Sequence, residues 1–198
     1  MGKITDPFKA ARYTERTVNQ ILVEWINKIV EELHLPLGKV RQETILADQK
    51  QPDILVFDID NKKVIVLIEL KIPSWDIYNS ELIHEAYRKT NKLNAQYFAT
   101  WNINKLVLFS VKKYEEVKEE NKPISEAIVQ KYDLNNIKTL EQIDEPEHKA
   151  SIQENIKKLF KELVDIAKHK KASPKISVDQ FFIQRLRVTI NSLEASFK

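Results

Sequence analysis

Residues 51–71, "QPDILVFDIDNKKVIVLIELK", are the most informative segment of the sequence. Two runs rich in Val, Ile and Leu flank the polar residues 60–62, "DNK", and this pattern predicts a β-hairpin. If these three residues form the turn, the numbers of cross-strand partners sum to 122. Phe57 then faces Ile65, and every other pair along the hairpin follows from the same register.

Charged residues stand at the far ends of both strands. The register places Asp53 opposite Glu69, and the alternation of side chains puts Lys71 on the same face. A two-residue turn would shift the sum by one and break this pairing. Charges at strand ends are usually solvated, but these strands are apolar on both faces, which is typical of covered strands. Two adjacent carboxylates there repel each other unless a cation lies between them, and a divalent metal suits that position best.

Composition indicates an ordinary globular protein. The chain has 198 residues, 42% of them hydrophobic and 31% charged, and a net charge of +3, which neither requires nor opposes a nucleic-acid partner. The absence of cysteine excludes disulfides and cysteine-based zinc sites. No apolar run has the length of a membrane span, and the start lacks the apolar stretch of a signal peptide. We therefore expect a cytoplasmic protein without a membrane partner.

The order of predicted elements indicates an α/β fold. An amphipathic helix with Thr14 as its N-cap precedes the hairpin and is expected to end near Pro36 and Gly38. A second helix is expected within residues 75–95. The segments that read as strands are 40–47, 52–59, 63–71, 97–101 and 104–111. This order predicts a central mixed β-sheet flanked by helices.

From about residue 123 the pattern turns helical. Residues 146–171 carry one apolar stripe, and the last predicted helix has no stop signal where the sequence ends. We therefore expect a core over residues 1–122 and a C-terminal helical extension over residues 123–198. Whether this extension links to a further C-terminal region is left open.

The charged ends of the hairpin resemble the motif of a known family. Pro52 and Asp53, then fifteen residues, then Glu69, Leu70 and Lys71 are similar to the PD-(D/E)xK motif of restriction-endonuclease-like nucleases. The later segment "AQYFATWNINKLVLF" resembles the N-terminal nuclease domains of type I restriction subunits and of fused restriction-modification enzymes. The resemblance implies a restriction-endonuclease-like core that hydrolyses DNA phosphodiester bonds.

The resemblance also implies roles for individual residues. Asp53, Glu69 and the backbone carbonyl of Leu70 would hold Mg²⁺, or Mn²⁺ in its place, and Lys71 would act on the attacking water. Glu15 points within about 40° of the apolar stripe of the first helix at 100° per residue. It matches the helix glutamate that many relatives place beside the metal, although a glutamate in a first helical turn also suits the helix dipole.

Other polar residues give weaker signals. His34, His84, His148 and His169 have no metal-ligand spacing, and the sequence has no phosphate-binding P-loop. The second predicted helix carries Arg88, Lys89 and Lys92, which could meet DNA phosphates or form a solvated face. Some relatives have a Gln and Tyr pair in this helix, whereas here only Tyr87 is present.

Partners follow from the resemblance. We expect DNA as substrate, a methyltransferase or target-recognition region in the same longer polypeptide, and dimerisation at least during cleavage, because cutting both strands needs two active sites. The alternative is a nuclease-fold module that binds DNA or a protein without cutting. The sequence does not indicate the recognition sequence, the cut position, or a dependence on ATP or S-adenosylmethionine.

Overall fold

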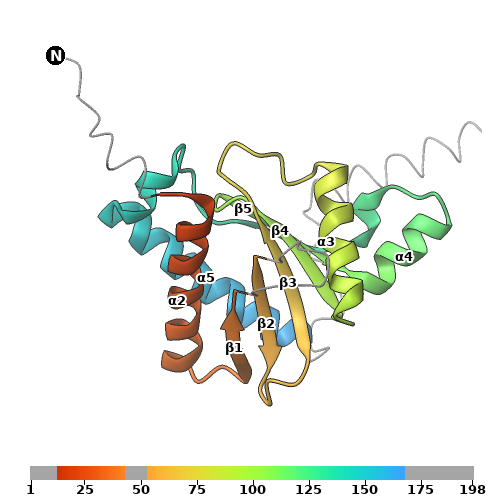
Figure 1. Ribbon diagram of the computed structural model, residues 1–198, viewed down its shortest axis with the longest axis horizontal. Helices are drawn as coiled ribbons and strands as arrows, with labels where there is room; N and C mark the ends of the chain where they lie inside the picture. Colours follow the sequence, from red (N-terminus) through yellow and green to blue (C-terminus); the bar gives the residue numbers. More distant parts are fainter. Residues whose placement is uncertain (1–12, 43–52, 168–198) are drawn as a thin grey trace, which may run out of the picture.

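A computed structural model describes residues 13–42 and 53–167 of the chain. Its core is one six-stranded sheet in which the strands follow in chain order, β1-β2-β3-β4-β5-β6. The pair β3–β4 is parallel, and the other four pairs are antiparallel, so the sheet is mixed. Figure 1 shows helices on both sides of this sheet. The predicted α/β class, with a central mixed sheet flanked by helices, is confirmed.

The described elements mix helices and strands along the chain. They are α2 (Glu15–Glu32), β1 (Leu37–Arg41), β2 (Ile54–Asp58), β3 (Val64–Leu70), α3 (Ser80–Lys92), β4 (Tyr97–Trp101), β5 (Lys105–Ser110), α4 (Val111–Glu119), the 3₁₀ helix η1 (Ile124–Ala127), β6 (Ile128–Asp133), the 3₁₀ helix η2 (Leu140–Asp144) and α5 (Pro146–Ala167).

The first helix begins as the sequence predicts. The side chain of Thr14 accepts a hydrogen bond from the backbone N–H of Thr17, and the side chain of Thr17 accepts one from the backbone N–H of Thr14, which forms a capping box. The helix ends at Glu32, before the expected stop near Pro36 and Gly38. Gly38 instead lies in β1, where a Cβ would lie 2.0 Å from the carbonyl oxygen of Asp58. Glycine therefore permits the close approach of β1 to β2.

The hairpin register is correct at the charged end, although the predicted turn is wrong. Ile54 pairs with Ile68 and Val56 with Val66, so the partner numbers sum to 122 there. Near the turn, Phe57 pairs with Val64 and not with Ile65. The turn is longer than predicted, and the partner numbers next to it sum to 121. A β-bulge then adds one unpaired residue in β3 and brings the sum to 122 toward the charged end.

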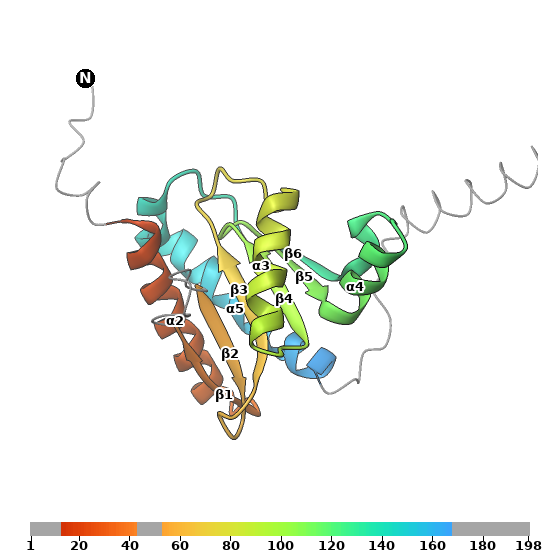
Figure 2. The same cartoon turned by 45° about the vertical axis from the view of Figure 1, so that its right-hand side comes forward.

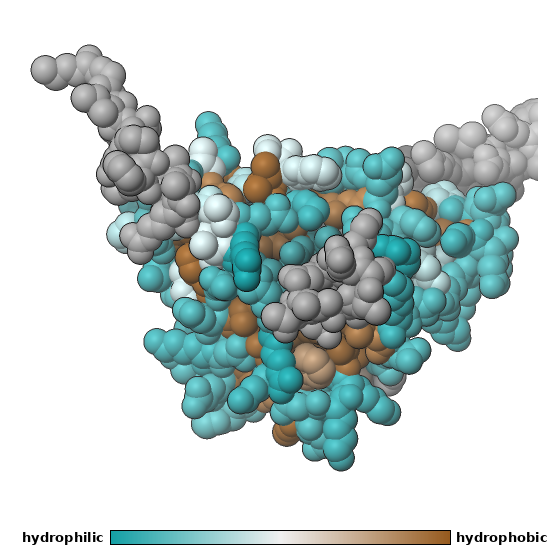
Figure 3. Space-filling view, viewed as in Figure 1, coloured by the Kyte–Doolittle hydropathy of each residue, from teal (hydrophilic) through white to brown (hydrophobic). Residues whose placement is uncertain are grey.

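Both faces of the sheet are covered, which explains the two-sided apolar pattern of its strands. On one face, Val56, Ile68 and Trp101 are buried against Leu22 of α2 and Phe160 of α5. On the other face, a core formed by β4, β5, α3 and α4 includes the stacked rings of Phe98 and Phe109, whose centroids are 4.9 Å apart. Figure 2 shows α3 and α4 on this second face, and hydrophilic residues cover much of the surface seen in Figure 3.

Two expectations about the strands are corrected. Residues 128–133 form β6, a strand paired with β5, and not the helix expected beyond residue 123. The strand expected at 40–47 is β1 at residues 37–41, and residues 43–47 lie outside the described part.

α5 confirms the helical stripe as far as Ala167 and shares its core with α2, while the predicted last helix lies outside the described residues. The division at residue 122 stays a prediction.

No helix among the described residues is long and apolar enough to cross a membrane. The cytoplasmic location stays a prediction.

Candidate active site

The predicted site residues lie together at one end of the sheet. Asp53 immediately precedes β2, Glu69 and Leu70 end β3, and Lys71 follows. Glu15 begins α2, which packs beside these strands. In Figure 1 this is the upper end of the sheet, opposite the hairpin turn. Residues far apart in the sequence therefore reach one place because two antiparallel strands and a helix begin or end there.

Asp53 is fixed by both its backbone and its side chain. Its Oδ2 accepts a hydrogen bond of 2.7 Å from the backbone N–H of Leu70. Its carbonyl oxygen accepts one of 2.8 Å from Nδ2 of Asn19, a buried residue of α2. The carboxylate is therefore held against the end of β3, and α2 is tied to the start of β2.

Lys71 lies between two carboxylates. Its Nζ is 3.2 Å from Oε1 of Glu15 and 3.5 Å from Oε1 of Glu69. Its backbone N–H donates to the carbonyl oxygen of Trp101 over 2.7 Å, which continues the β3–β4 pairing beyond the end of β3. Burial opposes its charge, but Glu69, Asp53 and Glu15 together outweigh burial and raise the pKa of Lys71. The amine is therefore a positioned ammonium ion.

Glu69 has a second lysine partner that the sequence analysis did not assign to the site. Nζ of Lys89, on α3, lies 2.9 Å from Oε1 and 2.7 Å from Oε2 of Glu69. Both side chains are almost fully buried, with 5% of Lys89 and 4% of Glu69 exposed. The interpretation of Lys89 as part of a solvated face is therefore wrong.

The electrostatics favour a cation near Asp53. Burial and the nearby charge of Glu69 raise the pKa of Asp53 to about 7, and the hydrogen bond from Leu70 and the charge of Lys71 only partly offset them. The three carboxylates Glu15, Asp53 and Glu69 lie close to two lysines, Lys71 and Lys89, so these five groups carry one excess negative charge when all are ionised. A positive ion would relieve this repulsion.

The donor set fits Mg²⁺ in its chemistry. Asp53 and Glu69 supply two carboxylates. The N–H and C=O of a residue in an extended strand point to the same side, so we expect the carbonyl oxygen of Leu70 to face Asp53 as its N–H does. Mg²⁺ commonly uses one or two carboxylates and completes its shell with water and substrate phosphate. Within residues 13–42 and 53–167, no group of three or more acidic or histidine residues is arranged to hold a metal, so a full protein cage is not present.

Glu15 lies beside Lys71 and forms an ion pair with it. Its side chain is 39% exposed, more than the 19% of Lys71, so it forms the outer edge of the cluster. Its predicted role at a second metal or in a metal's water shell stays a prediction.

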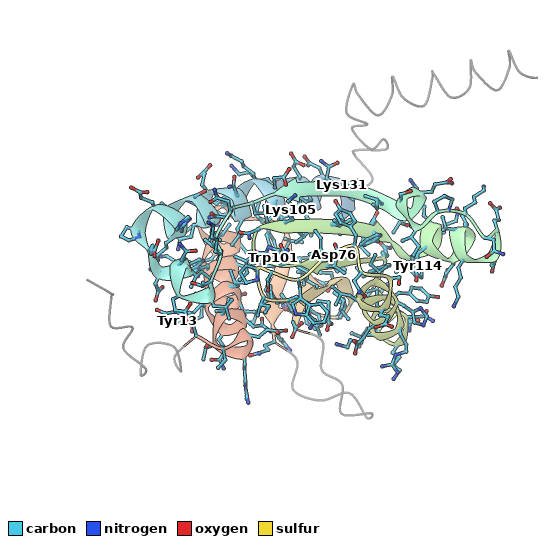
Figure 4. All side chains as sticks on the ribbon, turned by 90° about the horizontal axis from the view of Figure 1, so that it is seen from above. Tyr13, Asp76, Trp101, Lys105, Tyr114 and Lys131 are labelled. Carbon is cyan, nitrogen blue, oxygen red and sulfur yellow. The ribbon has the colours of Figure 1, made fainter. Side chains whose placement is uncertain are left out.

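The remaining polar residues take other positions. Tyr87 donates from its hydroxyl to Oε1 of Glu115 in α4, away from Glu69. His148 contacts Asn135 and Glu145, and neither contact belongs to the site. Figure 4 labels Trp101 in the middle of the sheet, with Tyr13 and Tyr114 toward opposite ends of the view. His169 lies outside the described residues.

Two site residues could have been found from helix periodicity. Lys89 occupies the apolar stripe of α3, because the buried positions of that helix are Leu82, Ile83, Ala86, Lys89 and Thr90. Asn19 likewise lies among the buried positions of α2. A polar residue on an apolar stripe indicates a buried partner, since burial without a partner is costly.

Comparisons with known proteins add little beyond this geometry. No protein-family model matches the sequence, and no curated protein matches it. The structure is similar to that of the type IIG restriction endonuclease BpuSI, with a TM-score of 0.45 and 13% sequence identity. The similarity covers 77% of this chain and 17% of that chain, so the chain spans less than a fifth of the protein it resembles.

Proposed function

We propose that this chain is a metal-dependent nuclease module that hydrolyses DNA phosphodiester bonds. The observation that carries the proposal is the convergence of Asp53, Glu69, Lys71 and Glu15 at one end of the sheet. The resemblance of residues 52–71 to the PD-(D/E)xK motif assigns the same residues to one active site. Geometry and motif therefore point to the same chemistry.

Asp53, Glu69 and the carbonyl oxygen of Leu70 would hold Mg²⁺, or Mn²⁺ as a substitute. The ion would polarise the scissile phosphate and lower the pKa of bound water. The chain's part is to hold the two carboxylates in place. The Leu70 N–H fixes Asp53 from one side, and the buried position of Glu69 on β3 fixes the other.

Lys71 would orient the attacking water and stabilise the charge that develops on the phosphate. Its ammonium is held by Glu15 and Glu69, so it does not have to be ordered when substrate binds. Glu15, more exposed than Lys71, would keep this lysine in place and contact the water shell. The expected products carry a 5′-phosphate and a 3′-hydroxyl.

The larger assembly follows as part of the same proposal. The module would serve as the cleavage part of a restriction-modification enzyme, with a methyltransferase or target-recognition region in the same polypeptide. Two copies would act together to cut both DNA strands. The full chain by itself is then expected to bind DNA weakly and without sequence preference, because no base-reading motif is recognised in its sequence.

The test is single-turnover cleavage of supercoiled plasmid in Mg²⁺ and in EDTA, with the wild type and two matched variants. Asp53→Asn removes a proposed metal ligand, while Asp58→Asn changes an aspartate at the other end of the same hairpin. We expect cleavage that requires Mg²⁺, that is lost in Asp53→Asn and that is kept in Asp58→Asn. Equal cleavage by both variants would refute the site assignment.

A second function, DNA or protein binding without cleavage, is favoured by one observation. Lys89 engages both oxygens of Glu69, so an ammonium inside the protein already balances the charge of this carboxylate. A site that no longer binds metal could keep this Lys89–Glu69 ion pair permanently. DNA binding by the wild type with no cleavage in Mg²⁺ or Mn²⁺ would support this second function.

A further inference from the structure

The Lys89–Glu69 pair is a feature that the proposed hydrolysis does not use. Lys89 reaches Glu69 from α3, on one side of the sheet, while Lys71 approaches the same carboxylate from the end of β3. The contacts of Lys89 are the shorter ones, at 2.7 and 2.9 Å against 3.5 Å for Lys71. Lys89 is therefore the principal partner of Glu69 in this structure.

The burial of this pair indicates a specific role. A lysine on a helix ordinarily extends its amine to water, because moving an ammonium out of water is costly unless a partner compensates. Lys89 instead lies among the buried residues of α3 with its amine on a buried carboxylate. Such a pair contributes little net stability compared with an apolar pair, so stability alone does not account for it.

Lys89 also has a second carboxylate within reach. Oε1 of Glu85, one helical turn earlier on α3, lies 3.9 Å from the same Nζ. The side chain of Glu85 is 34% exposed, against 4% for Glu69. The amine therefore stands between a buried carboxylate in the proposed site and a more exposed one beside it.

A metal ligated by Glu69 would compete with Lys89. Lys89 lies within hydrogen-bond distance of both oxygens of Glu69, and Lys71 approaches Oε1 as well, so three of the about four acceptor positions of this carboxylate face an ammonium. An ammonium at this distance also repels a dication on the same carboxylate. Binding of the ion at Glu69 would therefore require the two-oxygen contact with Lys89 to loosen.

We infer that Lys89 is a positioning residue that occupies Glu69 in the metal-free protein and moves toward Glu85 when a divalent ion binds. This inference rests on the proposed function. Lys89 then lowers the intrinsic affinity for the ion, and the negative phosphate of DNA offsets the positive charge of the two lysines. Metal binding is in this way coupled to DNA binding.

The test measures metal binding and not cleavage. Mn²⁺ is titrated into the full chain without DNA, and free Mn²⁺ is followed by its electron paramagnetic resonance signal. Lys89→Gln removes the competing charge, and Lys92→Gln, at an exposed position of the same helix, is the control. We expect Lys89→Gln to bind Mn²⁺ about tenfold more tightly than the wild type, in the range of residues that contact metal ligands, and Lys92→Gln to be unchanged.

Glu85→Gln gives an independent reading, because it keeps the Lys89–Glu69 pair and removes the second partner. We expect it to bind Mn²⁺ more weakly than the wild type. This variant decides the matter if melting curves show that Lys89→Gln does not fold.

The possible outcomes separate this inference from the proposed function. Binding that Asp53→Asn abolishes but that is not tightened in Lys89→Gln would overturn the inference and leave the metal site standing. If neither the wild type nor any variant, Lys89→Gln included, binds Mn²⁺, both the inference and the proposed metal site are overturned. Tighter binding in Lys89→Gln together with weaker binding in Glu85→Gln would support the inference.

Discussion

The two ends of the β2–β3 hairpin carry the same residue types and place them in opposite environments. At the turn, Asp58 accepts hydrogen bonds from the backbone N–H groups of Lys62 and Lys63, at 2.8 and 3.1 Å. At the other end, Asp53 accepts one from the N–H of Leu70, at 2.7 Å. Both aspartates thus serve the backbone, but only Asp53 lies beside another carboxylate in a covered part of the sheet.

The electrostatic consequences have opposite signs. Hydrogen bonding to the N–H of Lys63 is the main cause that lowers the pKa of Asp58, which is partly buried beside the turn. Burial is the main cause that raises the pKa of Asp53 to about 7. The motif residues therefore differ from ordinary turn residues through their covered environment, and not through their identity.

The largest expected effect is on cleavage. Asp53→Ala should reduce single-turnover plasmid cleavage in Mg²⁺ by about 10³-fold or more, since metal ligation supplies several kcal/mol of transition-state stabilisation. Asp58→Ala, at the turn, should cleave at the wild-type rate. Equal loss of activity in the two variants would contradict this account, because the end of the hairpin that carries Asp53 and Glu69 would then have no special role.

The next effect sharpens the role of Lys71 against a lysine at the turn. Lys71→Ala should lower the cleavage rate by about 100-fold without weakening Mn²⁺ binding, because the amine acts on water and phosphate and is not a ligand of the ion. Lys71→Arg should not restore the rate, since a guanidinium differs in shape and donor geometry. Lys63→Ala, at the exposed turn, is the control. A near-wild-type rate in Lys71→Ala would end the case for this residue.

A stability effect distinguishes the two carboxylates of the buried end. Glu69→Ala should lower the free energy of unfolding by about 3–5 kcal/mol, because it leaves the buried Lys89 without its principal partner. Asp53→Ala should cost less in the metal-free protein, since it also removes repulsion with Glu69. Urea titrations in EDTA measure both changes. Equal losses would contradict the structural role given to Lys89.

The last effect is a pH dependence of opposite sign at the two ends. The pKa of Asp53 rises from 3.8 to about 7 on folding, so this carboxyl makes the metal-free protein less stable as the pH rises from about 4 to 7. The pKa of Asp58 falls on folding, so Asp58 contributes stability above pH 3.8 that is lost as the pH falls through its folded pKa.

Melting temperatures of the wild type, Asp53→Asn and Asp58→Asn between pH 3 and 8, in EDTA, measure these contributions. Relative to the wild type, Asp53→Asn should become more stable as the pH rises, and Asp58→Asn should become less stable. The same direction in both variants would contradict the comparison.

The central part of this fold could be predicted because its strands are covered on both faces. Such strands are continuous apolar runs, and β2, β3, β4 and β5 were all expected close to their observed positions. The edge strand β6 is only partly buried and carries Lys131 and Asp133 among apolar residues, so it lacks a continuous run. Its signal was the group "IVQKY" after Pro123, which is rich in β-branched and aromatic residues.

The motif residues of the site could be predicted from the sequence, whereas helix periodicity indicates only that Lys89 and Asn19 are buried and not which groups they contact. The predicted register holds at Ile54 and Ile68, next to Asp53 and Glu69, because the β-bulge on β3 compensates for the turn. No sequence rule places a bulge at that position. The contact between Lys89 and Glu69 depends on how α3 lies across the sheet, and this tertiary packing is not readable from either segment alone.

The central claim is that Asp53 and Glu69 share one divalent ion. A crystal of the full chain soaked in Mn²⁺, measured for anomalous scattering, tests it most directly. We predict a peak about 2.0–2.6 Å from oxygens of both Asp53 and Glu69, with Asp58 at the turn unoccupied. A well-occupied Mn²⁺ elsewhere, with Glu69 still bound through both oxygens to Lys89, would contradict the claim.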